Sequence, residues 1–406
     1  MKKINRRYFL QKTALSASGL MMIPSALKAA FENSLSIPEV RNLKKLVVIQ
    51  LSGGNDGLNM IVPYSNDLYY KARPVLAVKR KDVIPLSEFQ GLNPVMAEFK
   101  ELYDKNELCV INNVGYPDPD RSHFRSMDIW QSASDANQYL KTGWIGRYLN
   151  SLPESERKPH AAIEVGKELD LALIGTGITG ISLEHPSRLY ENLRRGIFRP
   201  VAGMHQKTTG NDNLDYIYRT MNETVESVDY IHNTLNAENM TIPRNNNSGK
   251  LSGKLSIISS MIKAGLSTRV YYTTLTGFDT HVNQRPQQDR LLKELSQSVS
   301  GFVNDLEKAQ MMDNVVIMVF SEFGRRVAQN ASNGTDHGCA SNVLLIGKDL
   351  KNPGFYNEPP DLRDLDKGDI KYKVDFRSVY ASLLAHHLDS DPKAVLGRKF
   401  PLPDIV

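Results

Sequence analysis

Acidic and imidazole side chains follow several apolar runs of this 406-residue chain. Runs rich in Val, Ile, Leu, Tyr and Thr and bounded by Gly or Asn are typical of buried strands. In open α/β sheets, ligands lie just beyond the carboxyl ends of the strands. Mixed carboxylate and imidazole side chains there would suit one or two divalent Zn, Mn or Fe ions better than Ca²⁺. The metal ligands predicted from this pattern are Asp56, Asp279, His281, Glu322, Asp336 and His337.

Several of these positions also have a simpler interpretation. Asp56 lies in SGGNDGLN, and Gly, Asn and Asp form a turn by themselves. Asp279 and His281 are separated by one residue, which lets both side chains reach one cation, but Asp also commonly caps a following helix. Glu322 follows the run VVIMVF, where a nearly buried carboxylate needs a partner. The coincidence of several such positions favours a metal site.

Ser122 is the predicted nucleophile and a further predicted metal ligand. It follows the apolar run at 108–112 and a loop with two prolines, and it opens a predicted helix. The N–H groups at a helix N-terminus favour an anion or a developing alkoxide, and metal coordination activates a hydroxyl as a nucleophile. Ser is also among the preferred N-cap residues, so a purely structural role is the alternative.

Four further residues are predicted to bind the substrate: Asn55, Arg121, His123 and Arg325. Two glycines after the first strand allow a tight bend that brings Asn55 into the cleft. An arginine can hold an anionic oxygen with two parallel hydrogen bonds. The alternatives are a solvated basic turn for the arginines and an ordinary surface position for His123.

Composition and charge exclude some classes of protein. Hydrophobic residues make up 41% and charged residues 23% of the chain, as in ordinary soluble globular proteins. The net charge of +5 is mild, and no basic run is interleaved with aromatic residues, so nucleic acid is not an expected partner. Cys109 and Cys339 lie far apart in the sequence, and their spacing does not indicate a disulfide.

The N-terminal segment predicts export. Residues 1–30 contain Lys2 and Lys3, then Arg6-Arg7-Tyr8-Phe9-Leu10 and a modestly apolar stretch, and they resemble a twin-arginine (Tat) signal peptide. The apolar part is too short and too rich in Ser and Ala for a membrane span, and no later segment is long and apolar enough. We therefore expect a periplasmic or otherwise exported protein without a membrane span after removal of the leader, with 31–44 as a linker.

Strand-like and helix-like runs alternate after the linker. Predicted strands lie at 46–52, 108–115, 160–165, 269–275, 315–320 and 342–346. Predicted helices lie at 92–104, 122–132, 212–236, 251–264, 284–310 and 375–388, the last with Asp375 as N-cap. This alternation predicts one α/β domain over 45–406, with a mainly parallel sheet covered by helices on both faces. The polar segment 203–250 is predicted to be a helical insertion.

The order of these motifs resembles the alkaline-phosphatase-like superfamily, which includes phosphatases, sulfatases and phosphoglycerate mutases. More narrowly, the leader with LSGGNDGLN, SHFRSMDIWQ, GFDTH, SEFGRR and GTDHG resembles the bacterial domain-of-unknown-function family fifteen-oh-one. The resemblance covers nearly the whole chain after the leader and implies the superfamily's α/β fold.

The superfamily resemblance also implies how two cations would be bound. Its implied ligands are Asp56, Ser122 and Glu322 for the first ion, and Asp279, His281 and His337 for the second. The chain departs from the superfamily pattern because one residue, in place of three, separates Asp279 from His281. Phe323 stands where a His is expected, and Asp336 is an alternative ligand.

The sequence thus predicts an exported, metal-dependent hydrolase of phosphate or sulfate esters that uses a metal-activated serine on an anionic ester substrate. The alternative is an exported binding or assembly protein that retains the fold without catalysis. The altered Glu322-Phe323 pair favours that alternative, and the sequence does not indicate an oligomeric state.

Overall fold

The computed structural model describes residues 43–196, 198–203, 211–240, 242 and 249–406. The predicted leader and most of the predicted linker lie outside the described residues, as does part of the predicted insertion. In the part of the chain that is described, no helix is both long enough and apolar enough to cross a bilayer.

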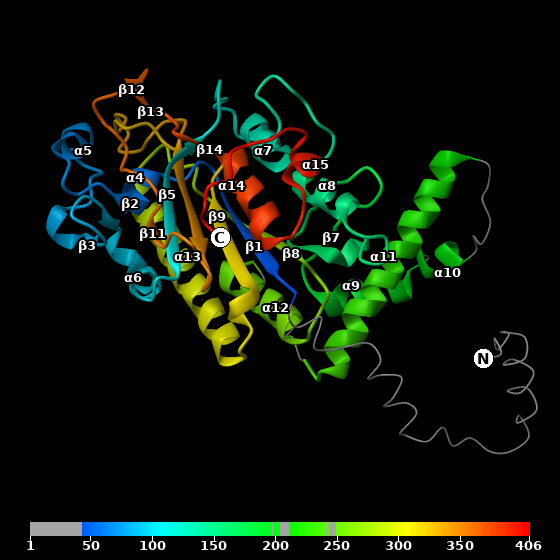
Figure 1. Ribbon diagram of the computed structural model, residues 1–406. Coiled ribbons are helices and arrows are strands. Elements are labelled where there is room, and N and C mark those ends of the chain that lie inside the picture. The colour runs from blue at the N-terminus through cyan, green and yellow to red at the C-terminus, as the bar shows by residue number, and fades with distance from the viewer. Residues whose placement is uncertain (1–42, 197, 204–210, 241, 243–248) are drawn as a thin grey trace, which may run out of the picture. The chain divides into compact units, whose positions relative to one another are not determined.

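A nine-stranded sheet contains all the predicted strands (Figure 1). Its main order is β11-β5-β10-β9-β1-β8-β6-β7, and β14 also pairs with β5. The bounds are β1 Lys45–Ser52, β5 Leu108–Gly115, β6 Ala162–Val165, β7 Ile181–Leu183, β8 Val270–Thr276, β9 Val315–Phe320, β10 Ser341–Ile346, β11 Gly354–Phe355 and β14 Val374–Asp375. The mixed, mostly parallel sheet confirms the predicted α/β fold class.

Strand β10 is the exception to the parallel arrangement, since it pairs antiparallel with both β5 and β9. No helix lies between β9 and β10, whereas a parallel return needs a long crossover that is usually helical. The chain therefore returns along the sheet in the opposite direction. As a result, the loop at 321–340 lies at the same edge of the sheet as the carboxyl end of β1.

The sheet is buried on both faces, as strand β1 illustrates. Val47, Ile49 and Leu51 belong to one buried apolar cluster, and Leu46 and Val48 belong to another. Alternate side chains of a strand point to opposite faces, so the two clusters are the two faces of the sheet. A continuous apolar run such as that of β1 is typical of strands covered on both sides.

Helices cover each face and contribute to these clusters. The first cluster receives side chains from α6 (Ala97–Asp104), α9 (Pro186–Arg195), α11 (Asp212–Ala237), α12 (Leu251–Lys263) and α13 (Gln284–Lys308). The second receives them from α7 (His123–Ser132), α8 (Trp144–Ser151), α14 (Phe376–Ser382) and α15 (Pro392–Leu396). Helix α14 is followed by one π-helical turn, Leu383–His387, and the Asp375 carboxylate accepts the Arg377 N–H as the predicted N-cap.

Smaller elements surround this core. Strands β2 (Ile61–Val62), β3 (Ile84–Pro85) and β4 (Gly91–Leu92) form a three-stranded sheet, and β12 (Leu365–Asp366) pairs with β13 (Asp369–Ile370). The remaining α-helices of the described residues are α4 (Gly57–Met60), α5 (Asp67–Ala72) and α10 (Phe198–Gly203). The predicted helix at 92–104 begins later, at Ala97, because β4 and a 3₁₀ turn starting at Pro94 occupy its first residues.

Candidate metal centre

Three histidines and one aspartate from distant parts of the sequence meet beyond the carboxyl ends of the strands. The Nε2 atom of His281 lies 2.9 Å from Nε2 of His337 and 3.0 Å from Oδ1 of Asp279. The same Asp279 oxygen lies 3.4 Å from Nε2 of His337 and 3.5 Å from Nε2 of His123. We call these four residues the histidine cluster.

Loops at one edge of the sheet position the histidine cluster. His123 is the first residue of α7, which follows β5, and Asp279 lies in the loop after β8. Gly53, just after β1, has a φ of +119°, and a Cβ there would lie 2.4 Å from the Asp279 backbone nitrogen. Only glycine therefore fits at position 53, which explains one of the two glycines before Asp56.

Partners behind two of the histidines orient them. The Nδ1–H of His123 donates to Oε1 of Glu322 over 2.9 Å, and the Nδ1–H of His337 donates to the Arg121 carbonyl oxygen over 2.7 Å. Both rings therefore direct Nε2 into the cluster. Metal-ligating histidines usually have such a carboxylate or carbonyl partner on the other nitrogen. The Phe323 ring packs against the imidazoles of His123 and His337, with centroids 4.8 and 4.7 Å away.

Arg325 forms an ion pair with Asp279. Its buried guanidinium donates to Oδ1 of Asp279 over 2.8 Å and to the backbone carbonyls of Gly53, Gly54, Phe278 and Thr335. Burial acts to raise the pKa of Asp279, but the hydrogen bond and charge of Arg325, together with the nearby histidines, lower it to about 2. Asp279 is therefore ionised at neutral pH. Because the Arg325 side chain is 0% exposed, it positions loops, in contrast to the substrate contact predicted from the sequence.

The local electrostatics differ between the histidines. The hydrogen bond from His123 to Glu322 raises the pKa of His123. Burial, the largest effect, lowers the pKa of His337. A histidine must be neutral to bind a metal, so the lowered pKa of His337 favours its metal-ligating form.

The donor atoms of the histidine cluster fit a divalent transition metal. One ligand atom from each of His123, Asp279 and His337 lies within 4.8 Å of the others. Two imidazole nitrogens and one carboxylate oxygen are ligands that Zn²⁺ and Fe²⁺ accept. Nε2 of His123 is buried and has no hydrogen-bond partner among the described residues. A buried polar atom without a partner is costly, and a cation would satisfy it.

Asp56, predicted as a ligand, lies instead in a buried ion pair. Its Oδ2 is 2.6 Å from the guanidinium of Arg73 and accepts a hydrogen bond of 2.5 Å from Gln284. The side chains of Arg73 and Asp56 are 0% and 1% exposed. Arg73 also donates to Asn59 and to two backbone carbonyls. The positive charge beside Oδ2 of Asp56 is therefore a guanidinium, and Asp56 is not in the group formed by His123, Asp279 and His337.

This buried pair gives a stability prediction. Arg73→Met should lower the free energy of unfolding by about 3–5 kcal/mol, because it leaves the Asp56 carboxylate buried and unpaired. Urea unfolding followed by circular dichroism measures the change. Arg80→Met is the matched control, since Arg80 forms a surface pair with Asp67 and its loss should leave the unfolding midpoint nearly unchanged. Equal midpoints for the two variants would contradict the assigned role of Arg73.

The other predicted site residues take varied positions. Ser122 is the N-cap of α7; it is exposed, and its side chain makes no capping hydrogen bond. Asp336 lies behind His281, with its Oδ1 3.4 Å from Nδ1 of that ring. The Arg121 guanidinium pairs with Asp369. Asn55 is buried and donates to the sulfur of Met60, so its side chain points into the interior.

The sequence analysis did not anticipate the observed contacts of two residues, His123 and Arg73. His123 was predicted to contact substrate, but it lies in the histidine cluster, while the predicted ligand Glu322 lies behind it. The sequence did contain a signal for the position of His123, since this residue directly follows Ser122 at the start of the same helix. No sequence signal marked Arg73, which lies in an ordinary short helix-to-loop junction.

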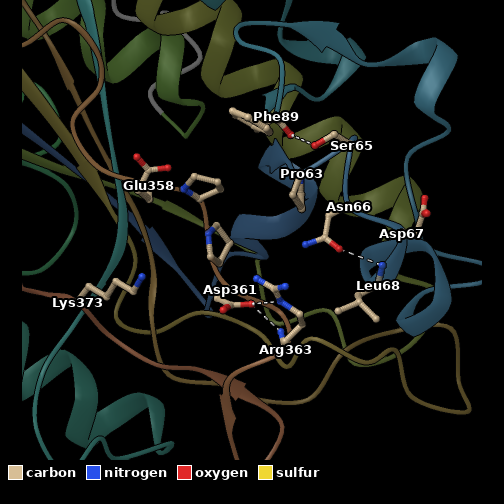
Figure 2. Close-up of a pocket in the computed structure, with 12 residues that line it drawn as sticks. Pro63, Ser65, Asn66, Asp67, Leu68, Phe89, Glu358, Asp361, Arg363 and Lys373 are labelled. Atoms are coloured by element: carbon tan, nitrogen blue, oxygen red, sulfur yellow. Dashed lines mark hydrogen bonds and ion pairs between the residues drawn. The ribbon is translucent and has the colours of Figure 1, made fainter.

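A separate groove of about 530 Å³ contains none of the predicted site residues (Figure 2). It lies between the segment around α5 and the segment 358–373, and Pro63, Phe89 and Arg363 are among its lining residues. The histidine cluster is thus distinct from this groove.

Comparison with protein families identifies the chain's relatives. The model of the family described as Protein of unknown function (DUF1501) matches residues 108–403. The chain belongs to this family. The DUF1501 match includes every residue of the histidine cluster, together with Ser122 and Glu322, whereas Asn55 and Asp56 lie before its first residue. The predicted membership of this family is thereby confirmed over residues 108–403, and no curated protein matches the chain.

Several solved structures are also similar to this DUF1501 chain. The lipoteichoic acid synthase LtaP from Listeria monocytogenes is 9% identical, with a TM-score of 0.34, and the match covers 79% of this chain and 73% of that chain. The PsFucS1 sulfatase from Pseudoalteromonas sp. is 11% identical, with a TM-score of 0.35 and coverage of 84% and 70%. A Vibrio parahaemolyticus protein in the alkaline phosphatase superfamily is 10% identical, with a TM-score of 0.32 and coverage of 79% and 63%.

Proposed function

We propose that this protein is a metal-dependent hydrolase of phosphate or sulfate esters. The observation that supports it best is the histidine cluster, in which His123, Asp279 and His337 face one another and each has a partner behind it. Metal-ligating side chains usually have a hydrogen-bond partner of their own, which fixes their orientation toward the metal. An ordinary surface ion pair does not require such an additional partner.

One divalent ion fits the arrangement. His123, Asp279 and His337 would hold it, and His281 is close enough to be a further ligand. Arg73 supplies a positive charge beside Oδ2 of Asp56, and the proposal therefore places the ion at the three residues of the cluster. When bound, the ion would polarise the ester oxygens and favour ionisation of a nearby hydroxyl.

Ser122 is the proposed nucleophile. Its hydroxyl lies at the N-terminus of α7, directly before His123, and is not used for capping. The N–H groups at this end of the ten-residue helix favour negative charge on an attacking oxygen and on the ester. The Ser122 oxygen would form a bond to phosphorus or sulfur as the bond to the alcohol oxygen breaks, and the proton lost by the Ser122 hydroxyl is balanced by the proton that the departing alcohol takes up. Water then hydrolyses the seryl ester, which restores the Ser122 hydroxyl and releases phosphate or sulfate.

A panel of esters tests the proposed function. Aryl phosphate, phosphodiester and aryl sulfate would be offered to the purified protein with Zn²⁺, Mn²⁺ or Fe²⁺, and after treatment with chelator. We expect hydrolysis of at least one ester, lost on chelation and restored by one of the metals. No hydrolysis of any ester with any metal would favour the alternative, a binding or assembly protein that retains the fold.

Glu322 provides a prediction that concerns metal affinity. Glu322→Gln should weaken metal binding by about 10- to 100-fold, because the neutral amide is a poorer acceptor for the Nδ1–H of His123. Competition with a chromogenic chelator measures the affinity. Glu307→Gln, far from the cluster in α13, is the control and should bind metal as the wild type does. An unchanged affinity in Glu322→Gln would remove Glu322 from the support of the centre.

We further propose export through the twin-arginine pathway, on the basis of Arg6-Arg7-Tyr8-Phe9-Leu10 in the leader. This pathway carries folded proteins, which suits a centre that is assembled before export. Replacement of both arginines by lysine should leave the protein in the cytoplasm, as measured by fractionation.

A further inference from the structure

A second cavity, of about 510 Å³, lies at the same edge of the sheet as the histidine cluster. Strands β1, β6 and β8 contribute residues at or near their carboxyl ends, and α7 and α12 contribute side chains. Its lining includes Gln50, Gln131, Glu164, Asp170 and Lys254. This edge is where ligands bind in open α/β sheets.

The cavity adjoins the supports of the histidine cluster. Ser52 lines it and directly precedes Gly53, whose N–H donates to Glu322 over 2.8 Å. Met127 also lines it, one helical turn after His123 on α7, and contacts the Ser52 hydroxyl. A molecule in the cavity would therefore lie beside the centre, in the position of the part of an ester that does not react.

The floor of the cavity is a buried polar network. The side-chain amide oxygen of Gln50 accepts hydrogen bonds from the Tyr272 hydroxyl and from the side-chain amide of Gln131, the latter over 3.2 Å. Glu164, which is 4% exposed, accepts the Asp170 N–H over 2.8 Å. Buried amides and carboxyls of this kind are costly for folding, and polar groups placed in a pocket usually orient a ligand.

The charges of the cavity partly cancel. Burial raises the pKa of Glu164 to about 9 and also raises the pKa of Asp170, so Glu164 is protonated at neutral pH. Burial lowers the pKa of Lys254, and its ammonium donates to the Thr274 carbonyl over 2.7 Å. The lining thus offers hydrogen-bond donors and acceptors side by side, which suits hydroxyl groups because each both donates and accepts.

We propose that this cavity binds the alcohol portion of the substrate and that this portion is polyhydroxylated, as in a sugar. An apolar alcohol would place its hydrocarbon surface against these polar side chains, and few apolar side chains line the cavity. The inference rests on the proposed function for its account of catalysis, but binding to the cavity can be measured separately.

Saturation-transfer NMR with glucose tests binding without requiring catalysis. We expect transfer to glucose in the wild type and in His337→Ala, and at least a threefold loss in Gln131→Met, which keeps the side-chain length but removes the amide. Gln297→Met, on the exposed surface of α13, is the matched control and should match the wild type. Absence of transfer in the wild type, or equal transfer in Gln131→Met, would overturn the proposal.

Kinetics then test the link to the centre. The ratio of kcat/KM for glucose 6-phosphate to that for phenyl phosphate should fall about tenfold in Gln131→Met and stay constant in Gln297→Met. If glucose binds but no ester of the panel is hydrolysed with any of the metals, the proposed function fails and the cavity assignment stands. If both esters are hydrolysed with an unchanged ratio in Gln131→Met, the cavity assignment fails and the proposed function stands.

Discussion

His337→Ala should reduce ester hydrolysis by about 10³-fold or more, because loss of the metal removes several kcal/mol of transition-state stabilisation. His337 is the ring whose Nε2 lies within 3.4 Å of both His281 and Asp279, and its replacement leaves a gap in the histidine cluster. Steady-state rates with the best ester of the panel, measured at saturating metal, give the size of the effect.

His386→Ala is the control for this experiment. His386 is an exposed histidine at the far end of the sequence, and its loss should leave the rate within twofold of the wild type. Elemental analysis should show less than about one tenth of the wild-type metal in His337→Ala. Full metal content together with full activity in this variant would exclude His337 from the centre.

Ser122→Ala should reduce turnover by about 10⁴-fold or more while metal content stays near that of the wild type. This is the scale expected when a covalent nucleophile is removed and the remaining site is intact. Because the Ser122 hydroxyl makes no capping hydrogen bond, its loss should cost little stability. Rate and metal content would be measured on the same preparation.

Ser134→Ala is the comparison variant, since Ser134 is a buried serine shortly after the C-terminus of the same helix and is not part of the proposed site. Its turnover should match that of the wild type. Turnover by Ser122→Ala within about tenfold of the wild type would mean that another group, such as water, attacks the ester.

The fold could be predicted because its signals are local. The continuous apolar runs of β1, β5 and β9 indicate strands covered on both faces, and Asp375 caps its helix as expected. The antiparallel direction of β10 could not be predicted, since the loop before it resembles any other polar segment. The direction depends on the absence of a helical crossover between β9 and β10.

The candidate site could be predicted in part. The loops that carry Asp279, His281 and His337 were expected to converge, and the structure brings these three side chains together. The pairing of Asp56 with Arg73 could not be predicted, because the two residues are 17 positions apart and meet only through the fold. Similarly, only the structure shows that Glu322 accepts a hydrogen bond from Nδ1 of His123, on the side of the ring away from the other cluster residues.

Arginine therefore accounts for much of the difference between the predicted and the observed site. Arg73 neutralises Asp56, and Arg325 joins the loops that carry Gly53 and Asp279. Both guanidiniums are buried, where their fixed donors satisfy several carbonyl oxygens at once. A basic residue in a polar loop is usually solvated, so its sequence context gave no indication of this role.

An anomalous-difference map from crystals of the protein, grown after loading with Zn²⁺ or Mn²⁺, is the most direct test of the metal centre. We predict one strong peak within bonding distance of Nε2 of His123, Oδ1 of Asp279 and Nε2 of His337, and no peak beside Asp56. A peak bound to Asp56, or a map without any peak near these three side chains, would contradict the account.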